Sequence, residues 1–217
     1  MVEVRKYVLG PLDTNAYLIV GPTYEAVLID APPGSLLRIT YLIDRGLIKL
    51  KYILITHAHT DHIAEAQAVK EVSSAKLIMG GDDLALIPLA RSLAKAWRVK
   101  WFNPIPDVLL KGDGTLDLNW LKIKFLHTPG HTPGSISYYV PELRMVFTGD
   151  TLFKGTVGRT DLPLASKGDL MLSLKKLVKE LPKDAKVMPG HGKETTIGDE
   201  VRNNLFVKYA LEFKEPT

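Results

Sequence analysis

The stretch THAHTDHI, at residues 56–63, contains three of the six histidines of the chain together with an aspartate. His57 and His59 stand two positions apart, so on an α-helix their side chains would diverge by about 200°. They can converge only on an extended or looped backbone. They directly follow the apolar run YILIT, at 52–56, which is consistent with a buried strand. The chain is therefore expected to place this histidine-rich loop at the end of a buried strand.

Asp61 and His62 follow in the same stretch, where a helix is expected to begin. Imidazole nitrogens and a carboxylate oxygen suit zinc, iron or manganese. An open catalytic zinc site takes about three ligands from protein, so four ligands from one loop favour two ions over one. The chain has no cysteine, so any metal site must use histidine and carboxylate side chains.

Three further candidate ligands stand beside glycines at the ends of predicted strands. His131 lies in HTPGHTPGS, Asp150 ends VFTGD, and His191 lies in PGHG. Sites in α/β folds form where strands end, so we expect these side chains to gather at one rim. The remaining candidate, His127, shares a predicted strand face with apolar residues and is more typical of a buried group than of a ligand.

Hydrophobic periodicity predicts an α/β sandwich of two mixed sheets, in one domain over residues 1–217. The expected strands cover 2–9, 15–20, 25–30, 52–56, 76–79, 121–127, 135–140, 144–149 and 185–189. The expected helices cover 35–46 with Ser35 as N-cap, about 63–72, 82–98 with a break at Pro88, 168–182, and 198–208.

The composition is that of an ordinary globular protein, with 46% hydrophobic and 24% charged residues. No apolar run reaches the length of about 18 residues that a membrane span needs. The first residues lack an apolar signal region, so a cytoplasmic location is expected. The net charge of +4 is spread out and mildly favours anionic small substrates over nucleic acid.

Four motifs, in this order, resemble the metallo-β-lactamase fold: THAHTDH, TPGHTPGS, FTGDTLF and MPGHG. Within that fold they are similar to the glyoxalase II-like branch, the hydroxyacylglutathione hydrolases and their short single-domain relatives. GDTLFKGTVGRTDLP is also similar to this branch, and the similarity runs from about Gly10 to Phe206. The family fold is a four-layer αβ/βα sandwich of two mixed β-sheets with helices on the outer faces.

The resemblance implies a ligand role for seven residues. It implies one ion held by His57, His59 and His131, and a second ion held by Asp61, His62 and His191, with Asp150 bridging them. Two divalent ions are therefore expected, zinc before iron or manganese. Asp61 and Asp150 are expected to serve catalysis by balancing the charge of the ions.

The implied activity is hydrolysis of a thioester by a hydroxide shared between the two ions. A thiol has a pKa of about 8.5 and can leave as thiolate without a dedicated acid. Arg159 in VGRTD would meet the carboxylate of the thiol carrier, or else pair with Asp161. Asp30, which ends VLID, would hold a ligand imidazole, or else serve as a cap.

Other readings stay open at this point. Full-length glyoxalase II adds a helical C-terminal domain that supplies much of its glutathione site, and no such domain is expected here, so the carrier is glutathione or another thiol. A persulfide dioxygenase-like oxidoreductase would use one iron on His57, His131 and Asp150. A metal-dependent nuclease of the same fold is a more remote alternative, and β-lactam hydrolysis could be a side activity.

Overall fold

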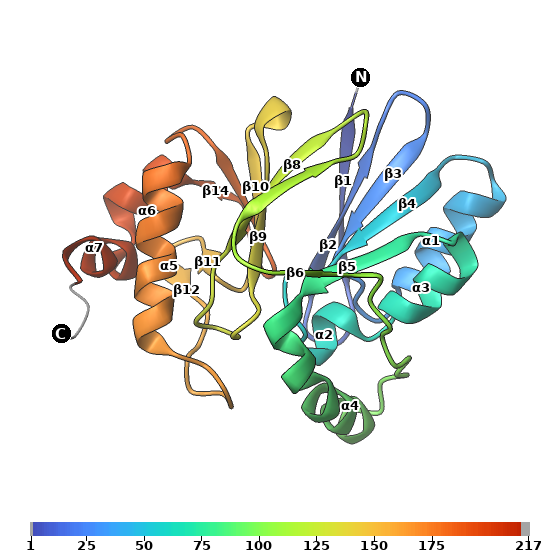
Figure 1. Ribbon diagram of the computed structural model, residues 1–217, viewed down its shortest axis with the longest axis horizontal. Coiled ribbons are helices and arrows are strands. Elements are labelled where there is room, and N and C mark those ends of the chain that lie inside the picture. Colours follow the sequence, from blue (N-terminus) through green and yellow to red (C-terminus); the bar gives the residue numbers. More distant parts are fainter. Residues whose placement is uncertain (1, 214–217) are drawn as a thin grey trace. The chain divides into compact units, whose positions relative to one another are not determined.

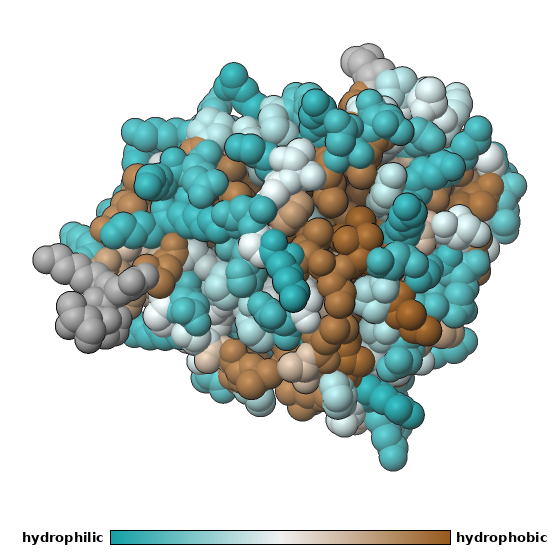
Figure 2. Space-filling model, viewed as in Figure 1, coloured by the Kyte–Doolittle hydropathy of each residue, from teal (hydrophilic) through white to brown (hydrophobic). Residues whose placement is uncertain are grey.

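The computed structural model describes residues 2–213, in two compact units, Met1–Leu110 and Lys111–Thr217. Each unit contains a six-stranded mixed β-sheet and its own helices (Figure 1). The prediction of an α/β protein with two mixed sheets is confirmed. Hydrophilic side chains cover much of the face seen in Figure 2, with hydrophobic side chains between them. Among the described residues, no helix combines the length and the apolar character that crossing a bilayer requires.

The sheet of the first unit consists, in spatial order, of β1 (Glu3–Leu9), β2 (Thr14–Val20), β3 (Glu25–Ile29), β4 (Lys49–Leu54), β5 (Lys76–Gly80) and β6 (Val108–Leu110). The pairs β1–β2 and β2–β3 are antiparallel, whereas β3 to β6 are parallel. Ile29 lies opposite Leu54, so β3 and β4 end side by side at one edge of the sheet. The residues that follow these two strands therefore start from neighbouring positions.

The helices of the first unit are α1 (Ser35–Asp44), α2 (Thr60–Ile63), α3 (Ala66–Ser73), the 3₁₀ helix η1 (Gly81–Leu86) and α4 (Ile87–Ala96). Ile39 of α1 and Val69 of α3 belong to one core cluster with Leu18 of β2 and Leu28 of β3. Alternate residues of a strand face one side of its sheet, so α1 and α3 cover the side that carries Leu18 and Leu28. This packing holds the ends of β3 and β4 in a rigid frame.

Four predictions for the first unit need correction. Ser35 is the first helical residue and not the N-cap, because Gly34 takes that position and Oε2 of Glu65 accepts hydrogen bonds from the backbone N–H groups of Gly34 and Leu36. The strand predicted at 52–56 begins three residues earlier and leaves the ladder after Leu54.

The single helix predicted near 63–72 is two helices, α2 and α3, because the chain bends at Glu65 to bond the carbonyl of Ala31. The helix predicted at 82–98 begins as η1, and α4 starts next to Pro88. Proline is tolerated in a first helical turn, where its missing N–H would have no partner within the helix.

The sheet of the second unit consists, in spatial order, of β14 (Thr195–Thr196), β13 (Lys186–Pro189), β10 (Met145–Gly149), β9 (Ile136–Val140), β8 (Lys122–His127) and β7 (Gly114–Asp117). Only the β10–β13 pair is parallel. A small hairpin, β11 (Leu152–Phe153) and β12 (Thr156–Val157), follows β10. The strands β6, β7, β11, β12 and β14 were not predicted, and each has two to four residues, too few to show a period.

The helices of the second unit are α5 (Lys167–Glu180), α6 (Ile197–Asn203) and α7 (Leu205–Glu212), with a short 3₁₀ turn, η2 (Pro141–Leu143). Leu170, Leu174 and Leu177 of α5 are buried in one cluster with Val207 of α7, as the leucine spacing predicts. The single helix predicted at 198–208 is wrong, because Asn204 ends α6 and caps α7 through its side-chain oxygen.

Candidate metal centre

The histidine-rich loop of the first unit begins where the sheet edge ends. Residues 55–59 form an irregular loop between β4 and α2, and His59 is the N-cap residue of α2. His57 and His62 are buried, with 1% and 0% of their surface exposed. The ring centroid of His57 lies 4.8 Å from that of His59 and 4.1 Å from that of His62. The loop therefore brings its three imidazoles together, which an uninterrupted helix would not allow for the His57–His59 pair.

Asp30, directly after β3, bonds both to Thr56 in this loop and to His62 in the helix α2 that follows it. Its Oδ1 accepts a hydrogen bond from the Thr56 backbone N–H at 2.7 Å, and its Oδ2 accepts one from the Thr56 hydroxyl at 2.8 Å. Oδ2 also lies 2.8 Å from Nδ1 of His62. Asp30 has a positive φ of 60°, a conformation that aspartate tolerates better than most residues. One buried carboxylate thus fixes both Thr56 and His62.

The contacts of His62 indicate which of its ring nitrogens carries the proton and which can bind a metal ion. Nδ1 faces the Asp30 carboxylate, so it carries the proton and donates. The lone pair then lies on Nε2, which is 3.4 Å from Oδ2 of Asp61. The Thr14 hydroxyl also donates to that Asp61 oxygen, at 3.1 Å. A ligand imidazole held by a carboxylate through its other nitrogen is a common arrangement in metal sites.

Two contacts from the η1–α4 segment hold the middle of the loop. The Ala58 backbone N–H donates to Oδ2 of Asp83 at 2.7 Å, and Asp83 is fully buried. The Thr60 hydroxyl donates to the carbonyl of Ala90 at 2.8 Å. Sequence reasoning missed Asp83. The only available signal was an acidic pair, Asp82-Asp83, at the start of the helix predicted over 82–98, and such pairs are common there.

In the second unit, Asp150 stands between two histidines. Its Oδ2 lies 3.6 Å from Nε2 of His131 and 3.6 Å from Nε2 of His191. Asp150 directly follows β10, and His191 follows the parallel neighbour β13, so the two emerge at one sheet edge. An oxygen equally distant from two imidazole nitrogens is a natural position for a ligand shared by two ions.

The orientation of His131 depends on a backbone carbonyl. Nδ1 of His131 lies 2.8 Å from the carbonyl oxygen of Arg159, so Nδ1 donates and Nε2 keeps its lone pair toward Asp150. The chain can approach this closely only because residue 158 is glycine. A Cβ built at Gly158 would lie 1.8 Å from the carbonyl oxygen of Asp150 and 3.1 Å from Nδ1 of His131. Sequence reasoning did not assign a role to this glycine.

A second glycine lets the His131 loop pass against α5. Gly130 has a φ of 133°, and a Cβ there would lie 2.3 Å from the backbone nitrogen of Leu170. Its carbonyl accepts a hydrogen bond from the Ser166 N–H at 2.8 Å. His127, the last residue of β8, is half-buried and lies with Nε2 2.8 Å from the carbonyl of Pro133. This contact is with the backbone of the loop that carries His131.

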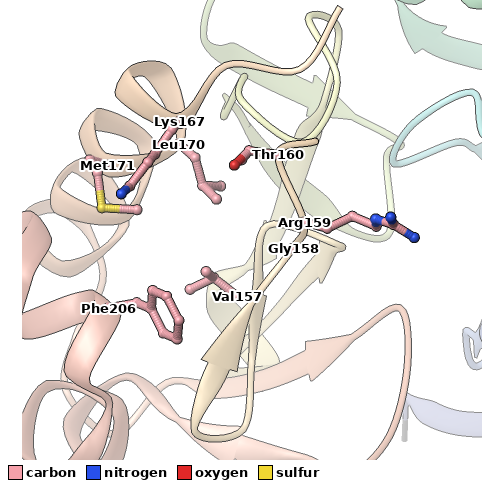
Figure 3. Close-up of a pocket in the computed structure, with 8 residues that line it drawn as sticks. All are labelled: Val157, Gly158, Arg159, Thr160, Lys167, Leu170, Met171 and Phe206. Atoms are coloured by element: carbon pink, nitrogen blue, oxygen red, sulfur yellow. The ribbon is translucent and has the colours of Figure 1, made fainter. Parts of the chain in front are cut away.

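The Arg159 side chain is exposed and forms a two-pronged ion pair with Asp161, both hydrogen bonds being 2.7 Å long. The guanidinium holds the pKa of Asp161 at about 2, below its ordinary value of 3.8. Figure 3 shows a hollow lined by Val157, Lys167, Leu170 and Phe206 among others, and the Arg159 side chain points away from it. In this structure Arg159 thus adopts the second of its two predicted roles, and contact with a substrate carboxylate stays a prediction.

The donor atoms in each unit fit divalent metal ions. The first unit offers His57, His59, His62 and Asp61, and the second offers His131, Asp150 and His191. These are the nitrogen and oxygen donors of zinc, iron and manganese sites. Both His62 and His131 are held through Nδ1, which leaves Nε2 as the ligand atom.

The chain matches a family model described as the Metallo-beta-lactamase superfamily over residues 9–191. The match includes all seven candidate ligands and extends across both units. It is therefore a match to most of the chain and not to a local motif.

Two relatives of known sequence match nearly end to end. The chain is 34% identical over 207 residues to the probable metallo-hydrolase YqgX of Bacillus subtilis, covering 94% of this chain and 96% of that protein. It is 33% identical over 203 residues to the hydroxyacylglutathione hydrolase GloC of Haemophilus influenzae, covering 89% and 92%.

Three solved structures have a similar fold. They are the B3 metallo-beta-lactamase BLEG-1 (TM-score 0.86, 33% identity, 94% of this chain and 99% of that one), TTHA1623 in a di-iron-bound form (0.82, 38%, 93% and 99%) and ETHE1 from Myxococcus xanthus (0.78, 26%, 99% and 92%). The three similarities extend over almost the whole chain.

Proposed function

The chain belongs to the metallo-beta-lactamase superfamily, and on that premise we propose that it is a two-metal hydrolase of thioesters, of the glyoxalase II type. The observation that carries the two-metal part is the position of Asp150. Its Oδ2 stands 3.6 Å from a ligand-type nitrogen on either side, as a carboxylate shared by two ions would. The similarity to a hydroxyacylglutathione hydrolase supports the thioester part.

The proposed ligand sets follow the family pattern residue by residue. One ion takes His57, His59 and His131, the other takes Asp61, His62 and His191, and Asp150 serves both. We propose zinc in both positions. Iron is the second choice, supported by the di-iron form of TTHA1623.

When bound, a pair of divalent ions supplies a hydroxide nucleophile at neutral pH and a Lewis acid for the substrate carbonyl. The residues of this chain prepare that chemistry. Asp30 and the Arg159 carbonyl accept from Nδ1 of His62 and of His131, which orients each ring and makes Nε2 its ligand atom. Asp61 and Asp150 supply negative charge that offsets part of the charge of the ions. The thiol product leaves as thiolate, because its pKa is about 8.5, so no separate proton donor is needed.

The proposed substrate is a small thioester, with glutathione as the first carrier to test because of the similarity to GloC. We propose that Arg159 exchanges Asp161 for a carboxylate of the carrier when substrate binds. A cytoplasmic location and the lack of a nucleic-acid partner stay predictions.

The test has two measurements: the metal content of the purified protein, and its rate of hydrolysis of a set of thioesters. We expect two ions per chain and hydrolysis of S-lactoylglutathione. The reaction is monitored through the free thiol that it releases. Asp150→Asn should lower kcat/KM more than about 100-fold, beyond the typical effect of losing a residue that only supports a ligand. Asp44→Asn is the matched control, because Asp44 is an exposed helix residue and should leave the rate unchanged.

A different outcome would point to the oxidoreductase alternative. One iron per chain, oxygen uptake with glutathione persulfide and no thioester hydrolysis would overturn the proposal in favour of a persulfide dioxygenase. Cleavage of RNA with no action on thioesters would overturn it in favour of a nuclease.

A further inference from the structure

The segment that follows the metal-binding loop of the first unit is rich in positive charge. Between Asp83 and Asp107 the sequence contains no acidic residue, but it contains Arg91, Lys95, Arg98 and Lys100. Most of this segment is α4 and the chain that leads from it to β6. The whole protein has a net charge of only +4, so this run departs from the balanced mixture elsewhere. A local excess of cations raises the local concentration of anions.

Two adjoining hollows lie along this segment. One, of about 520 Å³, is lined by Ile87, Pro88, Arg91, Ser92, Lys95 and Asn103. The other, of about 480 Å³, shares Arg91, Lys95 and Asn103 and adds Val99 and Trp101. Each is within the size range of small-molecule sites, about 300–1,000 Å³.

The polar groups that line these hollows are mostly donors. Arg91 and Lys95 stand one helical turn apart and are exposed, and no acidic side chain among residues 2–213 pairs with either. Asn103 adds a side-chain amide. Trp101 lines the second hollow, but its indole Nε1–H is buried and is not counted among these donors. A site rich in donors and cations fits a ligand that presents several anionic oxygens.

The hollows are fixed in position relative to the candidate metal ligands of the same unit. The residue before Arg91, Ala90, accepts the hydrogen bond from the Thr60 hydroxyl, and Thr60 follows His59. The turn before α4 holds Ala58 through Asp83. Anything bound along α4 is therefore held by the same rigid segment that positions His57 and His59.

We propose that Arg91 and Lys95, with Asn103 and Trp101, form a binding site for the anionic part of the thiol carrier, a carboxylate or phosphate group remote from the thioester. This inference rests on the proposed function and adds to it a second anion-binding site for the carrier, besides the contact proposed for Arg159. Binding energy from such a remote group can position the reacting carbonyl.

The experiment compares wild-type protein with an Arg91→Gln/Lys95→Gln variant. Glutamine keeps the helix propensity and removes both charges. The control is Lys175→Gln/Lys179→Gln, which removes two exposed cations at the same spacing from α5 in the other unit. The substrates are acetyl thioesters of glutathione, of coenzyme A and of neutral N-acetylcysteamine. The first two distinguish a carboxylate carrier from a phosphate carrier.

We expect the α4 variant to lose at least about tenfold in kcat/KM, through KM, for one or both acidic thioesters. A tenfold loss corresponds to about 1.4 kcal/mol. The neutral thioester should react at the wild-type rate, and the control variant should match wild type with all three substrates. Equal kinetics of the α4 variant and wild type on both acidic thioesters would overturn the site.

A binding measurement separates this inference from the proposed function. Calorimetric titration with S-methylglutathione and with S-methyl coenzyme A reports binding even if no thioester is hydrolysed. Binding to wild type that weakens about tenfold or more in the α4 variant supports the site whether or not turnover occurs. Failure of both ligands to bind wild type, or equal binding to both proteins, contradicts it.

Discussion

Nδ1 of His131 lies 2.8 Å from the carbonyl oxygen of Arg159, so a backbone atom, and not the arginine side chain, orients this imidazole. The carbonyl reaches the ring because Gly158 lets the backbone pass against Asp150. The arginine side chain can therefore be replaced without disturbing His131, whereas the glycine cannot.

Gly158→Ala should weaken metal binding. The added Cβ would overlap the Asp150 carbonyl oxygen, at 1.8 Å, so the backbone must move and the hydrogen bond to His131 is lost. Loss of a partner that orients a ligand typically costs about 10–100-fold in metal affinity. Zinc affinity is measured by competition with a chromophoric chelator. Gly168→Ala, where the nearest atom is 4.0 Å away, is the control, and an equal effect in both variants would refute the steric explanation.

Asp30→Asn should loosen the histidine-rich loop. The carboxylate accepts hydrogen bonds from the Thr56 N–H, the Thr56 hydroxyl and His62, and an amide presents one oxygen and an NH₂ group that opposes the Nδ1–H of His62. A buried group left without its partner costs about 1–3 kcal/mol of unfolding free energy. Urea unfolding of metal-free protein reports this loss. An unfolding free energy equal to that of wild type would mean that the contact carries no stability.

Arg159→Gln should shift the titration of Asp161. The guanidinium holds the Asp161 pKa at about 2, so the ion pair is fully present above the ordinary value of 3.8 and is lost as the pH falls through about 2. The variant should move this pKa back toward 3.8, as followed by NMR of the side-chain carboxyl group. The KM of an acidic thioester should rise in the same variant, while the neutral N-acetylcysteamine thioester serves as control. An unchanged Asp161 titration would show that the pair does not persist in solution.

Metal removal should lower stability without abolishing the fold. A ligand that binds only the folded state stabilises it by about 2.7 kcal/mol when present at 100 times its Kd. Chelation should therefore lower the midpoint of thermal unfolding, and added zinc should restore it. In Asp150→Asn the difference between the two midpoints should shrink. A midpoint that does not respond to zinc in the wild-type protein would contradict metal binding by these residues.

The long elements of the fold could be predicted because their apolar patterns are regular. The leucines of α5 recur at helical spacing, and the runs that become β2, β8 and β10 stand between clear turn residues. The motifs also showed which histidines and aspartates to consider, because ligands at such short spacing are hard to place in any other role.

The errors in the predicted elements come from contacts between residues distant in sequence. Glu65 caps α1 from 29 residues beyond Leu36, so a plausible capping serine was assigned a role it does not have. Asn204 splits a segment that reads as one helix, and its side-chain amide donates to the carbonyl of Thr156, 48 residues away. The roles of Asp83 and Gly158 were hidden for the same reason: each acts on a residue far away in the sequence, and neither carries a local signal.

The contacts of Asp30 bear on the entropy cost of capturing a metal ion. Because one carboxylate joins Thr56 to His62, the stretch between them is closed into a ring by side-chain hydrogen bonds. A loop ordered in this way before any ion arrives pays little entropy on capture, for zinc and iron alike. The saving in entropy comes from the protein and does not depend on which divalent ion binds.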